Sequence, residues 1–400
     1  MKVRISSDYN YLTFLIVFLL YFIPRYLEYT SFYNILFAKQ ALDICKSLSY
    51  VLSLLLFGLK FINNKKQTAK YTVIISICLL YFSYQAFLEN HSALFVILIF
   101  SFIFNEKYAK IYFRDIFVIS CILYLFTIVA CYFGCIENIV SHRNKFGSIW
   151  VSESFGFEYP GQMVMMLLPL VFLYFYIKNC RVNALDCFFC LALNIVVYTQ
   201  CKTIFGSVLI CVFLIAFSIL KYSISFSRFL KDSQWINKAP FIFVAIDVLL
   251  LFLFDGYKSI GKDLDILLNG RLSVSQRVIN KYGISFLGSD FKNSASNFFY
   301  EIIDSEYIHL IVAEGIIYLV FALLLCSLML KYAQKNKDKW LVLILLMVFF
   351  NSIVNNGIFS LVLNPFVICL VPAIKHFFNK DTLLKRKDIK FNHTLTLLSR

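Results

Sequence analysis

Residues 239–265 read APFIFVAIDVLLLFLFDGYKSIGKDLD, and the change of composition inside this stretch decides how the chain folds. Up to Phe254 the stretch is strongly apolar. From Asp255 to Tyr307 the chain instead carries six basic residues and seven carboxylates. A helix that crosses a bilayer needs about 20 mostly apolar residues. The boundary therefore predicts a membrane helix followed by a long polar loop.

Outside this loop, the composition is that of a membrane protein throughout. The chain of 400 residues is 60% hydrophobic and only 15% charged, whereas a soluble domain is about 25% charged. Its mean hydropathy is +0.76. No segment between the apolar runs is large enough to build a separate core. We therefore expect a single integral membrane domain, residues 1–400, with residues 255–307 as its large loop.

The apolar runs predict an all-α fold with about twelve spanning helices. The first run, from about Tyr11 to Ile23, lacks a small-residue cleavage site and is expected to remain as a first span. The predicted spans lie near residues 8–24, 42–62, 71–88, 92–105, 116–135, 159–178, 184–200, 203–221, 239–254, 308–331, 340–355 and 357–376.

The basic residues predict the orientation. Lys and Arg form short clusters between the apolar runs, and cytoplasmic loops are enriched in these residues. With the N-terminus inside, the inner segments hold more than twice as many Lys and Arg residues as the outer ones. We therefore expect both termini in the cytoplasm and the large loop, between helices 9 and 10, outside. This distribution explains the net charge of +15 without nucleic-acid binding.

The first outer segment runs from about Ile136 to Tyr159. It carries Arg143 and then Gly156–Gln162, which reads GFEYPGQ. The glycine and proline permit a tight return into the membrane. The alternative is a simple surface turn with a proline that starts a helix.

The large loop is the second outer segment. Leucine and isoleucine recur at three- and four-residue spacing between Lys262 and Gly283, which predicts an amphipathic helix with a break at Asn269-Gly270. Arg271 and Arg277 are candidate ligands for a diphosphate, because the planar guanidinium suits phosphate oxygens. The alternative is a solvated basic face attracted to anionic lipid heads.

The loop returns to the membrane through Asp304–His309, the third outer segment. Glu306 and His309 share one helical face at i,i+3 spacing. Glu314 lies deeper in an apolar run, where a carboxylate usually faces a cavity or a partner. It could instead be hydrogen-bonded to a neighbouring helix at the interface.

Together these segments resemble the O-antigen and capsular polysaccharide polymerases, relatives of the O-antigen ligases. The resemblance rests on Arg143, on Gly156–Gln162, on Gly270-Arg271 and on Ser305–Ile308 followed by Glu314–Ile317. Tyr159 and Gly161 replace a His and an Asn of the family's first motif. Asp304 or Ser305 stands where ligases carry a catalytic His, which favours a polymerase.

The resemblance implies a metal-independent glycosyltransferase without a cofactor in a bacterial inner membrane. It would transfer a growing glycan from undecaprenyl diphosphate onto a new lipid-linked repeat unit, beside a chain-length regulator and a flippase. Arg143, Arg271 and Arg277 would bind the diphosphate. The implied catalytic residues are Glu306, His309 and Asp304, with Glu314 and Tyr307 as further site candidates. An O-antigen ligase and a flippase or transporter remain alternatives.

Overall fold

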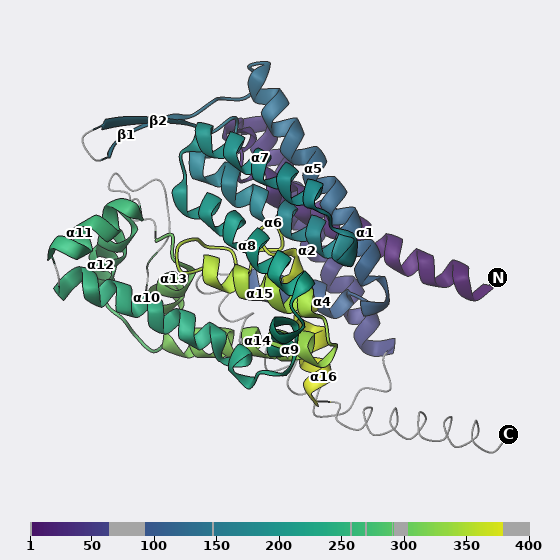
Figure 1. Ribbon diagram of the computed structural model, residues 1–400. Coiled ribbons are helices and arrows are strands. Elements are labelled where there is room, and N and C mark those ends of the chain that lie inside the picture. The colour runs from purple at the N-terminus through teal and green to yellow at the C-terminus, as the bar shows by residue number, and fades with distance from the viewer. Residues whose placement is uncertain are drawn as a thin grey trace.

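The computed structural model is almost entirely helical and describes residues 2–63, 93–145, 148–256, 258–268, 270–289, 291 and 303–378 (Figure 1). Within these residues, seven helices are long and apolar enough to cross a membrane, and four shorter apolar helices accompany them. The chain is therefore an all-α, multi-pass membrane protein. The number of twelve spans stays a prediction, and the predicted span near 71–88 lies outside the described residues.

The N-terminal helices are held together by aromatic side chains. The ring of Phe18 lies 5.4 Å from each of the rings of Phe22, Phe100 and Tyr112, which come from three helices. The many phenylalanines of the sequence therefore serve packing here as well as lipid contact. The elements of this part are α1 (Lys2–Leu27), the 3₁₀ turn η1 (Ser31–Asn34), α2 (Leu36–Asn63), α4 (Ala93–Ile103), η2 (Glu106–Tyr108) and α5 (Ala109–Tyr132).

A β-hairpin follows α5 in the predicted outer segment. Strand β1 (Val140–Lys145) pairs antiparallel with β2 (Ser148–Glu153), so that Val140 faces Glu153 and Arg143 faces Trp150. Alternation of exposed Ile149 and Val151 with buried Ser152 is the period of two that a strand requires. This hairpin was not among the predicted elements.

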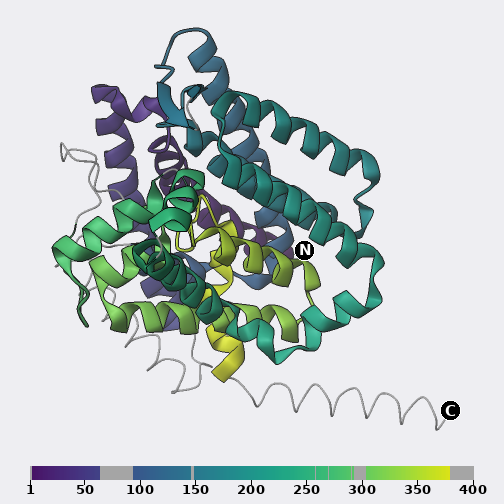
Figure 2. The same cartoon turned by 60° about the vertical axis from the view of Figure 1, so that its left-hand side comes forward.

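Helix α6 is the central span. Buried residues make up 78% of its most apolar window, against 11% for α2, whose apolar residues are largely exposed. Helices α5, α7 and α8 pack around α6, and Figure 2 shows α7 and α8 side by side. The elements here are α6 (Pro160–Lys178), η3 (Asn179–Arg181), α7 (Ala184–Cys201), α8 (Ile204–Tyr222), α9 (Ile224–Asp232), η4 (Gln234–Lys238) and α10 (Ala239–Gly256).

The amphipathic stretch of the large loop forms two helices, α11 (Lys258–Leu267) and α12 (Arg271–Tyr282). Gly270 separates them with a left-handed backbone at φ 82°, which glycine adopts without steric penalty. The predicted break is therefore confirmed at Gly270, while Asn269 lies outside the described residues. Residues 292–302 of the predicted loop lie outside the described residues.

The predicted helix at 308–331 is interrupted. Helix α13 (Glu306–His309) continues into the π-turn η5 (Leu310–Glu314), and α14 (Ile316–Lys335) starts anew after Gly315. The backbone of Ser285–Ser289 lies against this break, and Ile316 N–H donates to the Ser285 carbonyl at 3.1 Å. A Cβ on Gly315 would lie 2.4 Å from the Gly288 nitrogen. Only glycine allows this approach.

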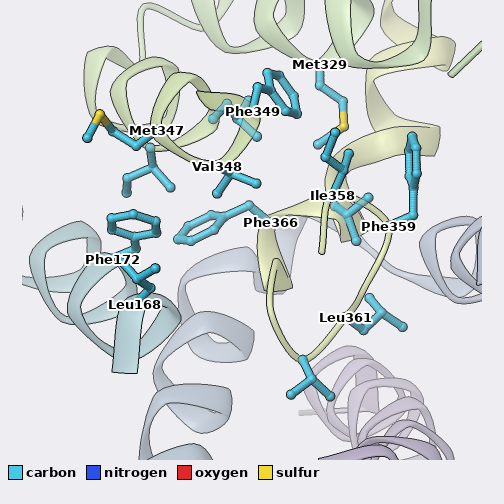
Figure 3. Packing of buried hydrophobic residues seen from close by; sticks show 14 of the residues in the cluster. Leu168, Phe172, Met329, Met347, Val348, Phe349, Ile358, Phe359, Leu361 and Phe366 are labelled. Atoms are coloured by element: carbon cyan, nitrogen blue, oxygen red, sulfur yellow. The ribbon is translucent and has the colours of Figure 1, made fainter. Parts of the chain in front are cut away.

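Two spans were predicted at 340–355 and 357–376. The first forms a helix only as far as Asn351, and the second is not a continuous helix. Helix α15 (Lys339–Asn351) ends early, and residues 352–364 form a non-helical segment before η6 (Pro365–Cys369) and α16 (Leu370–Phe378). We call residues 352–364 the buried connector. Non-helical backbone at membrane depth is tolerated only inside protein or along a cavity. Figure 3 shows connector side chains among core residues of α6, α14 and α15: Ile358, Phe359 and Leu361.

The loops gather at two ends of the molecule. At the hairpin end, Glu158 N–H donates to the Tyr29 carbonyl at 3.1 Å. At the opposite end, Tyr332 donates to Glu106 at 3.1 Å, and the Gln334 amide donates to Leu230 at 2.9 Å. Each of these bonds joins segments that the charge pattern predicts on one side of the membrane. The hairpin end as the outer side remains a prediction.

Candidate functional site

Arg271 is positioned by the start of α12. The Gly270 N–H donates to the Asp265 carbonyl at 2.7 Å. The Asp265 side chain accepts hydrogen bonds from the backbone N–H groups of Leu272 and Ser273, at 2.9 and 3.1 Å. A carboxylate in this position satisfies donors that have no partner in the first turn of a helix. These contacts of Asp265 fix the start of α12 at Arg271, directly after Gly270.

The guanidinium of Arg271 lies between two acceptors from distant parts of the chain. Its Nε donates to Asp304 Oδ2 at 2.7 Å, and Nη2 donates to Asn355 Oδ1 at 3.0 Å. Asn355 in turn donates from Nδ2 to Asn351 Oδ1 at 2.8 Å. The Arg271 side chain is 14% exposed and that of Asp304 is 33% exposed. The arginine is therefore oriented by its neighbours but still reachable.

Tyr159 of the first motif lies beside this pair. Burial and the charge of Asp304 raise the pKa of Tyr159 above its usual range, while the charge of Arg271 opposes the shift. We call Arg271, Asp304, Asn355 and Tyr159 the Arg271 cluster. It joins all three predicted outer segments and one segment that the prediction did not include.

The motif around Tyr159 is locked to the end of α1. Ser31 N–H donates to the Gly156 carbonyl at 2.8 Å, and Phe157 is fully buried. A Cβ on Gly156 (φ 84°) would lie 2.6 Å from Ile136. Burial, and to a lesser degree the charge of Glu28, raises the pKa of the neighbouring Glu158. The motif is thus a surface turn anchored to the end of α1, and Pro160 begins α6, as the alternative prediction had it.

Glu306 joins the start of α13 to the buried connector. Its backbone N–H donates to the Ser352 carbonyl at 3.0 Å, and its Oε2 accepts from Gly357 N–H at 2.7 Å. Burial raises the pKa of Glu306 to about 7, and the Gly357 hydrogen bond limits the rise. This carboxyl group therefore keeps its proton to a higher pH than an exposed glutamate does.

Ser305 begins α13 and brings in a residue that the sequence analysis missed. Its Oγ accepts from Ile308 N–H at 3.2 Å, as an N-cap does, and donates to Asp247. Asp247 is buried in α10. A single carboxylate inside an apolar run is a signal in the sequence, because such residues are usually functional or paired.

The other predicted residues take varied positions. Tyr307 is fully buried and donates to the Phe349 carbonyl at 2.7 Å. Glu314 is buried at the end of the π-turn, and His309 is half-buried with its ring 6.1 Å from that of Phe291. Arg277 is exposed on α12, and Arg143 lies on β1. The structure brings Arg271, Asp304 and Glu306 to one region.

Asn355 and Asn356 are the second set that sequence reasoning missed. Asn356 Nδ2 donates to the Ile303 carbonyl at 3.0 Å, directly before Asp304. The Asn-Asn-Gly sequence at 355–357 is a turn signal that an apolar average over twenty residues hides. Among the described residues, no group of three or more His, Cys, Asp or Glu side chains is placed to hold a metal ion.

Comparisons with known proteins give no independent identification. No protein-family model, curated protein or solved structure matches the chain. The function is therefore argued from the site.

Proposed function

We propose that the protein is a glycosyltransferase that polymerises lipid-linked glycan repeats at the hairpin end of the membrane domain. The observation that carries the proposal is the Arg271 cluster: a half-buried arginine fixed beside a carboxylate and a tyrosine, next to spanning helices. A substrate with a polyprenyl tail and a diphosphate head would reach such a site from the bilayer.

The reaction requires a cation where the diphosphate leaves. The acceptor hydroxyl attacks the anomeric carbon of the growing glycan, the bond from that carbon to the diphosphate oxygen breaks, and undecaprenyl diphosphate departs with the electron pair. Groups held in place before the reaction stabilise this charge best. Arginine has five N–H donors, and Arg271 uses two in the contacts to Asp304 and Asn355. Its remaining donors are the proposed diphosphate ligands.

The acceptor hydroxyl must also lose its proton to a base. We propose Asp304 for this role, because its side chain is 33% exposed and already lies at the arginine. Glu306 is buried and holds Gly357, so we propose that it supports the site from behind. His309 remains a further candidate for the base.

Deletion of the gene in its host distinguishes this proposal from its alternatives. In a Gram-negative host, a mutant that lacks a polymerase carries core lipopolysaccharide capped with a single repeat. Long chains that stay on undecaprenyl diphosphate would indicate a ligase, and a complete absence of surface repeats would indicate a flippase. Gel separation of lipopolysaccharide and of extracted lipid-linked glycan reads out all three outcomes.

Complementation with point variants tests the site itself. Arg271→Ala should leave single repeats, while Arg228→Ala, which removes an exposed arginine of α9 at the opposite end, should restore long chains. Arg277→Ala then reports whether the exposed face of α12 also takes part. Long chains from an Arg271→Ala protein at wild-type abundance would refute the diphosphate role.

A further inference from the structure

A basic pocket lies at the opposite end of the molecule from the Arg271 cluster. It has a volume of about 610 Å³ and is formed where α5 begins, α6 and α9 end, and the turn between α14 and α15 passes. Near the pocket, the Tyr332 hydroxyl of α14 donates to Glu106 of η2, directly before α5, at 3.1 Å. The pocket is thus assembled from the ends of spanning helices.

Positive charge dominates its wall. The only carboxylate among the lining residues is Asp338, and both of its oxygens are occupied by protein donors. Oδ1 accepts from Leu341 N–H at 3.0 Å, and Oδ2 accepts from the Tyr176 hydroxyl at 2.9 Å. The cations of the lining are Lys110, Arg114, Lys231, Lys337 and Lys339.

These cations differ in how firmly the protein holds them. Arg114 is 63% exposed and shares a 3.2 Å contact with Asp115. Lys339 donates to the Leu220 carbonyl at 2.9 Å. Lys110 and Lys337 are exposed, and Lys231 is half-buried. Long, exposed ammonium groups around a hollow favour an anion with several oxygen acceptors, such as a phosphate.

The apolar part of the lining favours a lipid over a soluble phosphate. Ile111 and Ile177 line the pocket and are 40% and 38% exposed, each on a membrane-spanning helix. Acyl chains could lie against these two side chains. Two of the lining aromatics, Phe113 and Trp340, are instead buried in the core. The third, Tyr176, is half-buried, and its ring packs edge-on against Phe113 and Phe366.

We propose that this pocket binds the phosphate headgroup of an anionic membrane phospholipid, with the acyl chains running past Ile111 and Ile177. Basic pockets between the ends of spanning helices are a known mode of recognition for such headgroups. The site is separate from the Arg271 cluster, and it would stand even if the proposed reaction were wrong.

Lys337 allows binding to be separated from folding. It has a backbone φ of 56°, which asparagine tolerates better than lysine. Lys337→Asn should therefore keep or improve the stability of the protein while it removes a cation. A triple variant, Lys110→Gln with Lys231→Gln and Lys337→Asn, removes three cations of the pocket. The matched control replaces three exposed cations at the same end that do not line the pocket: Arg228→Gln, Lys238→Gln and Lys335→Gln.

The measurement is the thermal stability of the full-length protein, purified in detergent and titrated with cardiolipin, phosphatidylglycerol or phosphatidylcholine. We expect the first two lipids, but not the third, to raise the melting temperature of the wild type and the control. In the pocket variant, the concentration needed should rise about a hundredfold, since each cation near an anionic headgroup contributes about a factor of five.

Two results would overturn the proposal. Equal weakening in the pocket variant and the control would show diffuse surface charge instead of a site. Equal stabilisation by millimolar inorganic phosphate would show a site for a soluble anion instead of a lipid.

Discussion

The Arg271 cluster and the basic pocket both present cations at the ends of spanning helices, but they are built on opposite plans. In the cluster, Arg271 is half-buried, with a carboxylate at 2.7 Å and an amide at 3.0 Å. In the pocket, most cations are exposed, and the one carboxylate of the lining is used by other groups. The cluster holds one guanidinium in a fixed orientation, whereas the pocket brings together several loosely held cations.

The difference indicates that the two regions interact with negative charge in different ways. Fixed, partly desolvated hydrogen bonds suit the stabilisation of charge that develops during a reaction. Exposed cations make weaker contacts that salt screens over about 8–10 Å. Substitutions at the cluster should therefore have large effects that depend on geometry. Substitutions at the pocket should have small effects that add up and depend on charge.

The largest effect is expected where the backbone itself supports the cluster. Gly315→Ala places a Cβ 2.4 Å from the Gly288 nitrogen at a φ of 92°, so the backbone of Ser285–Ser289 and the break at Gly315 cannot both keep their places. We expect a loss of more than about 3 kcal/mol and little folded protein. Size-exclusion chromatography in detergent measures the folded fraction.

Gly134→Ala is the control for backbone conformation alone. Gly134 has a φ of 72° but no atom within 4 Å of an added Cβ. This variant should lose only about 1 kcal/mol and stay monodisperse. Similar losses in both variants would mean that the contact between Gly288 and Gly315 is unimportant.

Exchange of arginine and lysine tests geometry against charge. Arg271→Lys keeps the charge but cannot reach Asp304 and Asn355 with a planar fork. We expect a fall in polymer synthesis of about a hundredfold, similar to the loss of one fixed donor at a charged transition state. Lys231→Arg in the pocket should leave lipid stabilisation unchanged. The ladder of glycan lengths and the lipid titration measure the two effects. A larger effect of Lys231→Arg on lipid stabilisation than of Arg271→Lys on polymer synthesis would contradict the proposed difference between the two regions.

Glu306→Gln should change how stability depends on pH. The folded-state pKa of Glu306 is raised from 4.5 to about 7. The unfolded state therefore holds fewer protons than the folded state between these values, and stability falls as the pH rises through this window. We expect the wild type to lose a few degrees of melting temperature between about pH 5 and pH 8. Glutamine still accepts from Gly357, so the variant should show a flatter profile. Parallel profiles would assign the dependence to other groups.

The smallest effect is expected for one cation of the pocket. Lys110→Gln should weaken stabilisation by anionic lipid about fivefold, corresponding to about 1 kcal/mol. Raising the salt concentration should reduce the difference between this variant and the wild type, because exposed charges are screened. Titration at two salt concentrations tests this. A loss as large as that of the triple variant would mean that Lys110 acts as a fixed ligand.

Hydropathy predicted the helices well where one continuous apolar run forms one helix. Helices α6, α7 and α8 begin and end within two residues of the predicted ranges. The break at Gly270 was also predictable, because a glycine after an asparagine is a local signal. The interruption at Gly315 was not predicted. It depends on Gly288, which is distant in sequence, and on the backbone between Ser285 and Ser289.

The candidate site was also predicted only where its residues carry a local signal in the sequence. Arg271, Asp304 and Glu306 stand out as charges at the edges of apolar runs. Asn355 was missed because it lies inside an apparently apolar run, and its role comes from a contact with Arg271 across 84 positions of sequence. Asp247 was missed although its charge is visible. Its partner Ser305 is 58 positions away.

The buried connector also constrains how the protein enters the membrane during synthesis. Its backbone and amide groups find acceptors and donors in Glu306 and Ile303, and Ser360 lies 3.5 Å from the hydroxyl of Tyr29. Because unpaired backbone groups are costly in lipid, we expect this segment not to leave the translocation machinery into lipid by itself. The ribosome has already delivered every one of those partners when residues 352–364 emerge. We therefore expect the chain from residue 352 onward to be inserted only after the bundle that receives it has assembled.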